Sequence, residues 1–281
     1  MNWQKNVSEQ KKADQEKHKE TQTVYRRQKG MRKMKDYVLE ACVDSVESAL
    51  AAQKGGATRL ELCSDLIVGG TTPSPCLFEK IKKEVNIRTH ILIRPRFGDF
   101  CYTQYETDIM KEEIKMFRNL GAEGIVIGAL RSDGSLDLEK MEQFLNEADG
   151  MWVTLHRAFD VCIDPFQTLS EAVKLGISCI LSSGQENCCL EGKELLKKMQ
   201  EKAGEQIQIL AGGGVNAQVI QKLYEETKIT SYHMSGKITV ESPMRYRRKE
   251  VSMGLPSFSE YEQFRTSQKK ISEAKNVLED L

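Results

Sequence analysis

Short apolar runs alternate with longer amphipathic stretches over most of the chain after residue 36. Runs of this kind, rich in Val, Ile and Leu, predict β-strands. We expect eight strands, at residues 37–43, 59–63, 90–95, 124–129, 152–157, 178–183, 206–211 and 231–235. The stretches between them carry apolar residues at helical spacing, which predicts a helix in each gap.

Capping residues mark where these helices should begin. Asp44, Ser74, Asp164 and Asn216 stand at predicted starts, and proline follows two of them. Eight strand–helix units in 220 residues predict an α/β protein with a single TIM-type (β/α)8 barrel, at 37–256. A C-terminal helical extension at 257–281 would cap the barrel or meet a partner.

An open, doubly wound sheet is the alternative architecture. Such sheets commonly carry a GxGxxG turn after their first strand, and the sequence has none there. We therefore prefer the barrel and expect no nucleotide cofactor.

Alternate residues along each predicted strand should point to opposite faces of the sheet, because side chains alternate across a strand. One parity is apolar and should face the outer helices: Leu39, Ala41, Val43, Leu60, Leu62, Ile91, Ile93, Val153 and Leu155. The other parity is polar and should face the lumen: Glu40, Cys42, Glu61, Cys63, Arg94, Arg96, Thr154, His156, Gln208 and His233. Buried charges need partners, so we expect the glutamates and arginines to bond one another or a ligand. A purely structural salt-bridge network is the alternative.

A four-residue pattern occurs in two successive strands, as Leu-Glu-Ala-Cys at 39–42 and Leu-Glu-Leu-Cys at 60–63. If the strands are neighbours, the thiols of Cys42 and Cys63 would lie at equal height along the barrel axis. They could then bind one soft metal ion, such as Cu(I), between them. Two small buried hydrophobic residues are the alternative interpretation.

Long loops should cover the C-terminal mouth of the barrel, where such barrels place their sites. Loops after the seventh and eighth strands often hold phosphate, which makes Gly212, Gly213, Gly214, Ser235 and Gly236 candidates for anion binding.

An enzyme acting on a small anionic or phosphorylated metabolite could also use this mouth. Arg94 and Arg96 would clamp the anion. Glu40, Glu61 or His156 would serve as general acid or base. Asp160 could serve the chemistry, orient a loop or cap a turn, and His233 fits best as a core histidine with satisfied hydrogen bonds.

Composition and charge indicate the class of partner and the cellular compartment. The 281 residues contain 41 basic and 41 acidic side chains, yet residues 1–36 hold eleven Lys/Arg against five Asp/Glu. We expect this basic segment to be a disordered or loosely helical tail. Interspersed acids weaken its case as a nucleic-acid arm, so no nucleic-acid partner is expected. The chain has no apolar run of membrane-spanning length and no secretory signal, and its eight cysteines include no CxxC pair. These features favour free thiols in the cytoplasm.

Ordered motifs from about residue 37 to 250 resemble the copper homeostasis protein CutC family. They include Glu40–Ala49, Arg59–Ser64, Gly69–Ser74, Ile93–Arg96 with Gly98–Phe100, Gly121–Gly124, Leu155–Asp160, Ala211–Val215 and the His233 segment. The resemblance implies a TIM-type barrel, a cytoplasmic homo-oligomer (dimer or tetramer) and a role in copper handling, with Cys42 and Cys63 matching the family's cysteines. It implies no established reaction. Copper homeostasis is the leading function, and enzymatic activity stays open.

Overall fold

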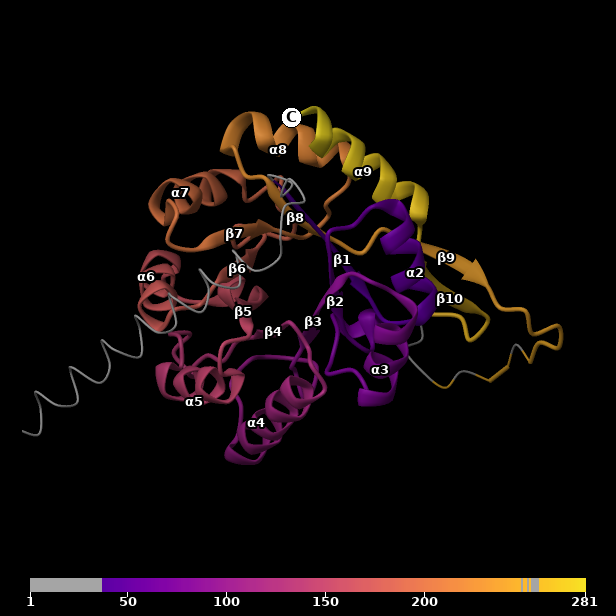
Figure 1. Ribbon diagram of the computed structural model, residues 1–281, viewed down its shortest axis with the longest axis horizontal. Helices are drawn as coiled ribbons and strands as arrows, with labels where there is room; N and C mark the ends of the chain where they lie inside the picture. The colour runs from indigo at the N-terminus through magenta and orange to yellow at the C-terminus, as the bar shows by residue number, and fades with distance from the viewer. Residues whose placement is uncertain (1–36, 249, 252, 254–257) are drawn as a thin grey trace, which may run out of the picture. The chain divides into compact units, whose positions relative to one another are not determined.

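Eight parallel strands form a closed barrel in which each strand pairs with its neighbours in the chain and β8 pairs with β1 (Figure 1). The computed structural model describes residues 37–248, 250–251, 253 and 258–281, and the basic segment 1–36 lies outside them. The barrel strands are β1 (Val38–Val43), β2 (Arg59–Leu62), β3 (Arg88–Leu92), β4 (Gly124–Ile127), β5 (Trp152–Leu155), β6 (Cys179–Ser182), β7 (Gln208–Ala211) and β8 (Ser231–Met234). The predicted TIM-type barrel is confirmed.

Helices surround the ring of strands (Figure 1). They are α2 (Val46–Gly55), α3 (Pro75–Glu84), α4 (Gln104–Asn119), α5 (Leu138–Ala148), α6 (Pro165–Leu175), α7 (Lys193–Ala203) and α8 (Ala217–Thr227), with short 3-10 turns η1 (Leu66–Val68) and η2 (Arg157–Val161). Ser74, Asp164 and Asn216 cap their helices as predicted, each accepting a bond from a first-turn backbone N–H. At α2 the cap is Ser45, one residue beyond the predicted Asp44.

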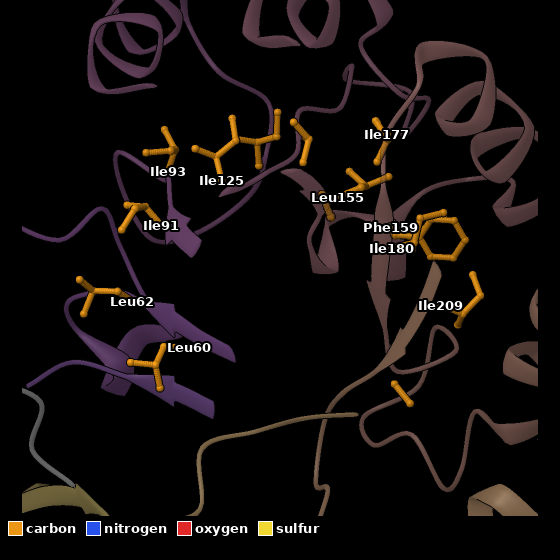
Figure 2. Packing of buried hydrophobic residues seen from close by; sticks show 14 of the residues in the cluster. Leu60, Leu62, Ile91, Ile93, Ile125, Leu155, Phe159, Ile177, Ile180 and Ile209 are labelled. Carbon is orange, nitrogen blue, oxygen red and sulfur yellow. The ribbon is translucent and has the colours of Figure 1, made fainter. Parts of the chain in front are cut away.

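The main core lies between the barrel and its outer helices. Leu60, Leu62, Ile91 and Ile93 are fully buried there, and Figure 2 shows them on neighbouring strands. All nine side chains predicted to face the helices belong to this core. Apolar burial of this extent is the principal source of stability in such a fold.

The C-terminal segment differs from the continuous helix expected at 257–281. Strand β10 (Glu262–Thr266) pairs with β9 (Lys237–Glu241) in an antiparallel ribbon, and helix α9 (Gln268–Asp280) starts only after Ser267, its cap. The pairing of β10 with β9 satisfies its backbone groups in a ladder instead of a helix. Helix α9 packs against α2 and α8 on the outside of the barrel. None of the helices in the described part of the chain has the length and apolarity needed to cross a bilayer.

Gly55 lets α9 approach α2 closely. A Cβ at this position would lie 2.6 Å from the Cβ of Ile271 and 2.9 Å from the carbonyl oxygen of Gln268. We expect Gly55→Ala to lower the free energy of unfolding by about 1–3 kcal/mol, as overpacking does. Urea unfolding of the variant measures this loss. Lys54→Ala, an exposed neighbour, is the control and should shift stability by less than about 0.5 kcal/mol. Equal effects of the two substitutions would contradict the close packing of α9.

Candidate functional site

Two buried thiols meet inside the barrel near the ends of β1 and β2. The Sγ atoms of Cys42 and Cys63 lie 3.7 Å apart. Leu92 and Val126, from β3 and β4, complete a small apolar cluster with them. The expectation of equal height was wrong, because Cys42 stands opposite Glu61 in the strand register. Cys63 is therefore a diagonal neighbour, and its side chain still reaches Cys42 across the strand pair.

Closure of the barrel adds a histidine to this cluster. Strand β8 pairs with β1, and this pairing sets His233 directly opposite Glu40. The Nδ1 atom of His233 lies 2.8 Å from Oε1 of Glu40, and its Nε2 lies 3.3 Å from Oε2 of Glu61. Ligand atoms of Cys42, Glu61 and His233 all lie within 4.8 Å of one another. His233 is thus hydrogen-bonded as a core histidine would be, and it is also part of a candidate metal site.

Glu40 is the electrostatic anchor beneath the thiols. Its carboxylate is fully buried and forms an ion pair with Arg59, on the facing rung of β2. Burial alone would raise the pKa of Glu40, but the Arg59 guanidinium and the hydrogen bond from His233 outweigh burial and hold the pKa far below its usual range. Glu40 is therefore ionised at neutral pH. Sequence reasoning overlooked Arg59, although it shares the inward parity of Glu61 and Cys63.

The two thiols above Glu40 keep their protons. The hydrogen bond with Cys63, together with burial, raises the pKa of the Cys42 thiol well above its usual value. The hydrogen bond from Cys42 lowers the pKa of Cys63, but burial and the Glu61 carboxyl outweigh it and raise the pKa. Burial also raises the pKa of Glu61. For His233, burial is outweighed by the Glu61 charge and by bonds with Cys42 and Glu40, which raise its pKa well above 6.5. A metal ion would have to displace the thiol protons.

The donor set fits a soft metal ion. Thiolate and imidazole ligands select Cu(I) or Zn²⁺ over hard cations such as Mg²⁺. For metal–sulfur bonds of about 2.3 Å, two tetrahedral ligands stand about 3.8 Å apart, close to the separation of the two thiols. Glu40 holds the ring of His233 so that Nε2 faces Glu61, an arrangement like the carboxylate–histidine pairs that orient metal ligands.

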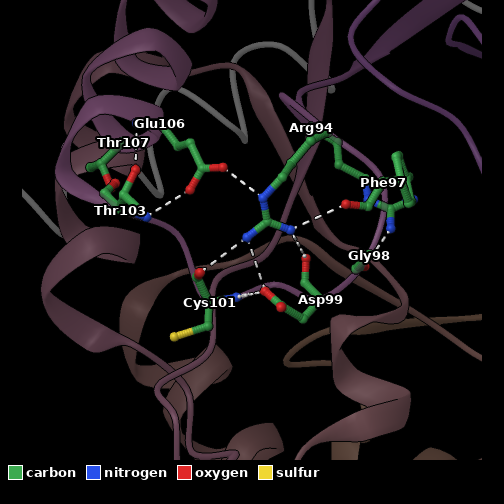
Figure 3. A network of polar contacts seen from close by, with 9 residues as sticks. Arg94, Phe97, Gly98, Asp99, Cys101, Thr103, Glu106 and Thr107 are labelled. Carbon is green, nitrogen blue, oxygen red and sulfur yellow. Dashed lines mark hydrogen bonds and ion pairs between the residues drawn. The ribbon is translucent and has the colours of Figure 1, made fainter.

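Among the described residues, neither Arg94 nor Arg96 bonds Glu40 or Glu61, so the expected Glu–Arg bonds were wrong, whereas bonding to a ligand stays a prediction. Nε of Arg96 donates to Glu106 at 2.6 Å, and its Nη2 donates to Asp99 at 3.0 Å. Further bonds run to carbonyl oxygens of the same loop, and Figure 3 shows this network with Asp99, Cys101 and Glu106. Arg96 therefore holds the loop after β3 in place. Arg94 stays buried and bonds the carbonyls of Gly70 and Gly98.

His156 and Asp160 occupy different settings after β5. His156 is buried, and its Nδ1 accepts the backbone N–H of Ala158 at 3.1 Å. Burial and the nearby Arg94 charge lower the pKa of His156 to about 3. Asp160 accepts bonds from Arg157, Ser182 and Ser183, among others. Asp160 thus ties the loop after β5 to the loop after β6, which agrees with the loop-orienting role among its predicted options.

The residues proposed for anion binding follow the neighbouring strands β7 and β8. Gly212 donates its N–H to Ser182 on β6, and Gly213 accepts a bond from Cys189. Gly236 packs against Ile271 of α9 and accepts a bond from Ser267, while the carbonyl of Ser235 accepts from Thr266. The C-terminal segment thus covers the loop after β8. Anion binding at Gly212, Gly213, Gly214, Ser235 and Gly236 stays a prediction.

A cleft of about 480 Å³ lies instead between the loops after β2 and β3. Its lining includes Thr71, Thr72, Arg94, Phe97 and Glu113. The mixture of charges in this lining favours a polar occupant over an apolar one.

Comparison with known proteins agrees with the motifs and the barrel. Residues 37–238 match the CutC family. The chain belongs to the CutC family. A CutC family protein of Bacteroides fragilis strain YCH46 is 42% identical over 242 residues, covering 85% of this chain and 96% of the relative. The human copper homeostasis protein cutC homolog is 41% identical over 226 residues, covering 80% and 83% of the two chains.

Solved structures give the same result for the CutC fold. A CutC structure from Streptococcus agalactiae superposes with a TM-score of 0.68 at 33% identity, covering 71% of this chain and 98% of that one. Thiamine phosphate pyrophosphorylase from Pyrococcus furiosus, at 15% identity and a TM-score of 0.52, covering 88% and 97% of the two chains, shares the fold alone. The predicted family is confirmed.

The buried pair of Glu40 and Arg59 predicts strong coupling between two substitutions. Arg59→Met should lower the free energy of unfolding by about 3–5 kcal/mol, because it leaves a buried carboxylate without its cation. Adding Glu40→Gln should restore part of this loss. A double-mutant cycle from urea unfolding measures the coupling, with exposed Arg88→Met as control. Additivity within about 0.5 kcal/mol would show that the pair is not coupled.

The depressed pKa of His156 predicts a loss of stability on acidification. Between pH 6.5 and about 3 the unfolded chain binds a proton at this ring and the folded chain does not, so stability falls as pH falls through this window. From pH 7 to 5 the loss from this residue should be about 2 kcal/mol. His156→Asn keeps a capping acceptor but does not titrate. Urea unfolding at both pH values should therefore show a smaller acid loss in this variant, and equal losses would contradict the assignment.

Proposed function

We propose that this CutC family protein handles copper by binding Cu(I) through the thiolates of Cys42 and Cys63. The observation that carries the proposal is the 3.7 Å separation of their Sγ atoms inside the barrel. Relatives are named copper homeostasis proteins, which favours copper as the cargo. A cytoplasmic location and a homo-oligomeric state stay predictions.

Burial supports reversible and selective capture by this pair. Cys63 is fully buried and Cys42 is 7% exposed, so water and hard cations have little access to the thiols. Apolar Leu92 and Val126 pack with the two cysteines in one buried cluster and suit a soft ion that needs few ligands. His233 and Glu61 stand next to Cys42 and can accept or release protons as the thiols ionise. His233 is the candidate for a third ligand.

An anaerobic Cu(I) titration against a competing chelator tests the site. We expect one tightly bound ion per chain in the wild type and a loss of at least about 100-fold in affinity for the Cys42→Ser, Cys63→Ser double variant, since the ion loses both soft ligands. Cys179→Ala, a buried cysteine on β6, is the matched control and should bind like the wild type. Binding that survives in the double variant would refute the proposal.

Two further readouts sharpen this experiment. Binding displaces thiol protons, so apparent affinity should rise with pH by about tenfold per displaced proton for each unit. His233→Gln should weaken binding only if the imidazole is a ligand. A parallel titration with Zn²⁺ identifies the ion: tighter retention of Zn²⁺ than of Cu(I) would make the site a zinc site and overturn the copper assignment.

A further inference from the structure

A second group of buried polar atoms lies at the C-terminal mouth, on residues that the thiol cluster does not use. Arg94 follows β3 and His156 follows β5, and both side chains lie against Phe100 of the loop formed by residues 95–103. Arg94 is 8% exposed and His156 is 5% exposed. Each carries a buried nitrogen, Nε in Arg94 and Nε2 in His156, that bonds no group within the described part of the chain.

The proton on His156 can be placed from its contacts. Nδ1 accepts the backbone N–H of Ala158 at 3.1 Å, so this nitrogen carries a lone pair. The neutral imidazole then carries its proton on Nε2, which makes Nε2 a hydrogen-bond donor without an acceptor. Burial and the Arg94 charge keep the ring neutral, since they lower its pKa to about 3.

Arg94 supplies a second such donor together with a positive charge. Its Nη1 donates to the carbonyl of Gly70 at 3.1 Å and its Nη2 to the carbonyl of Gly98 at 2.7 Å. No carboxylate of residues 37–248 or the described residues beyond them forms an ion pair with it. A buried guanidinium without a counter-charge is unfavourable, because desolvation is offset only by partial dipoles.

Phe100 lies close to both side chains. Its ring centre lies 5.0 Å from Cζ of Arg94 and 4.7 Å from the ring centre of His156. Arg96 fixes the loop that carries Phe100 through its bonds to Asp99, Cys101 and Glu106. Phe100 thus lies against both of the buried side chains that carry an unpartnered N–H group.

We propose that this mouth binds a small oxyanion, a carboxylate or a phosphate group, which accepts hydrogen bonds from Nε of Arg94 and Nε2 of His156 beneath Phe100. An anion neutralises the buried guanidinium and satisfies both donors at once. The side chains that would hold the anion are different from those of the thiol cluster. It gives the chain the substrate-binding half of an enzyme that acts on a small acidic metabolite.

Nitrogen NMR of histidine-labelled protein tests the proposal directly. The chain has four histidines, so the resonance of His156 can be assigned by its absence in His156→Asn. Titration with malonate and, separately, with inorganic phosphate should shift the Nε2 signal of His156 in a saturable way for at least one probe, and the stronger probe identifies the anion class. An unchanged signal with both probes would overturn the proposal.

Binding measured by calorimetry with the same probe gives the second test. Arg94→Gln should weaken binding at least tenfold, and Arg94→Lys should keep part of the affinity if charge is the main contribution. Arg88→Gln, at the exposed start of the strand that precedes Arg94, is the control and should bind like the wild type. Near-ultraviolet circular dichroism checks that each variant is folded. Full affinity in folded Arg94→Gln would refute the site, whereas full affinity in the Cys42→Ser, Cys63→Ser variant would show that it is separate from the thiols.

Discussion

The carboxylate of Glu40 joins the first, second and last strands of the barrel, and the arrangement of the lumen depends on it. It pairs with Arg59 on β2 and accepts a bond from His233 on β8. Strands β1 and β8 come from opposite ends of the barrel sequence, so this single side chain bridges the place where the sheet closes. A charged group at this position orients His233 as well as neutralising Arg59. The geometry around Cys42 therefore follows from an ion pair one rung below it.

Alternation along the strands was enough to predict the barrel and its packing. The apolar parity of residues such as Leu60 and Ile91 placed them against the helices, where they lie. The same rule failed for Arg96, because β3 ends at Leu92 and the period of two has no meaning beyond the last paired residue. Arg96 turns instead to the start of α4, where Glu106 of the capping box accepts its N–H. Arg94 also lies beyond the ladder, and its place is set by loop carbonyls.

Side-chain contacts that depend on strand register could not be predicted from the sequence. The matching motifs at 39–42 and 60–63 suggested thiols at equal height, yet the register places Cys42 opposite Glu61. Similar motifs do not specify how two strands are staggered, since stagger follows from closing the whole ring. The contact of His233 with Glu40 and Glu61 has the same origin. The β9–β10 ribbon was missed for a related reason, because its pairing partner lies about twenty residues away across a polar segment.

Gly70 connects the chemistry of the lumen with the loop above it. Its backbone has a φ of +89°, and a Cβ there would lie 2.8 Å from Leu92 and 3.5 Å from the sulfur of Cys63. Its carbonyl also accepts the bond from Arg94. The missing side chain leaves room for Leu92, which packs with the two thiols, while the carbonyl of the same residue holds the guanidinium. The thiol cluster and the surroundings of Arg94 are thus constrained by one residue that has no side chain. A substitution at Gly70 cannot alter one of them without disturbing the other.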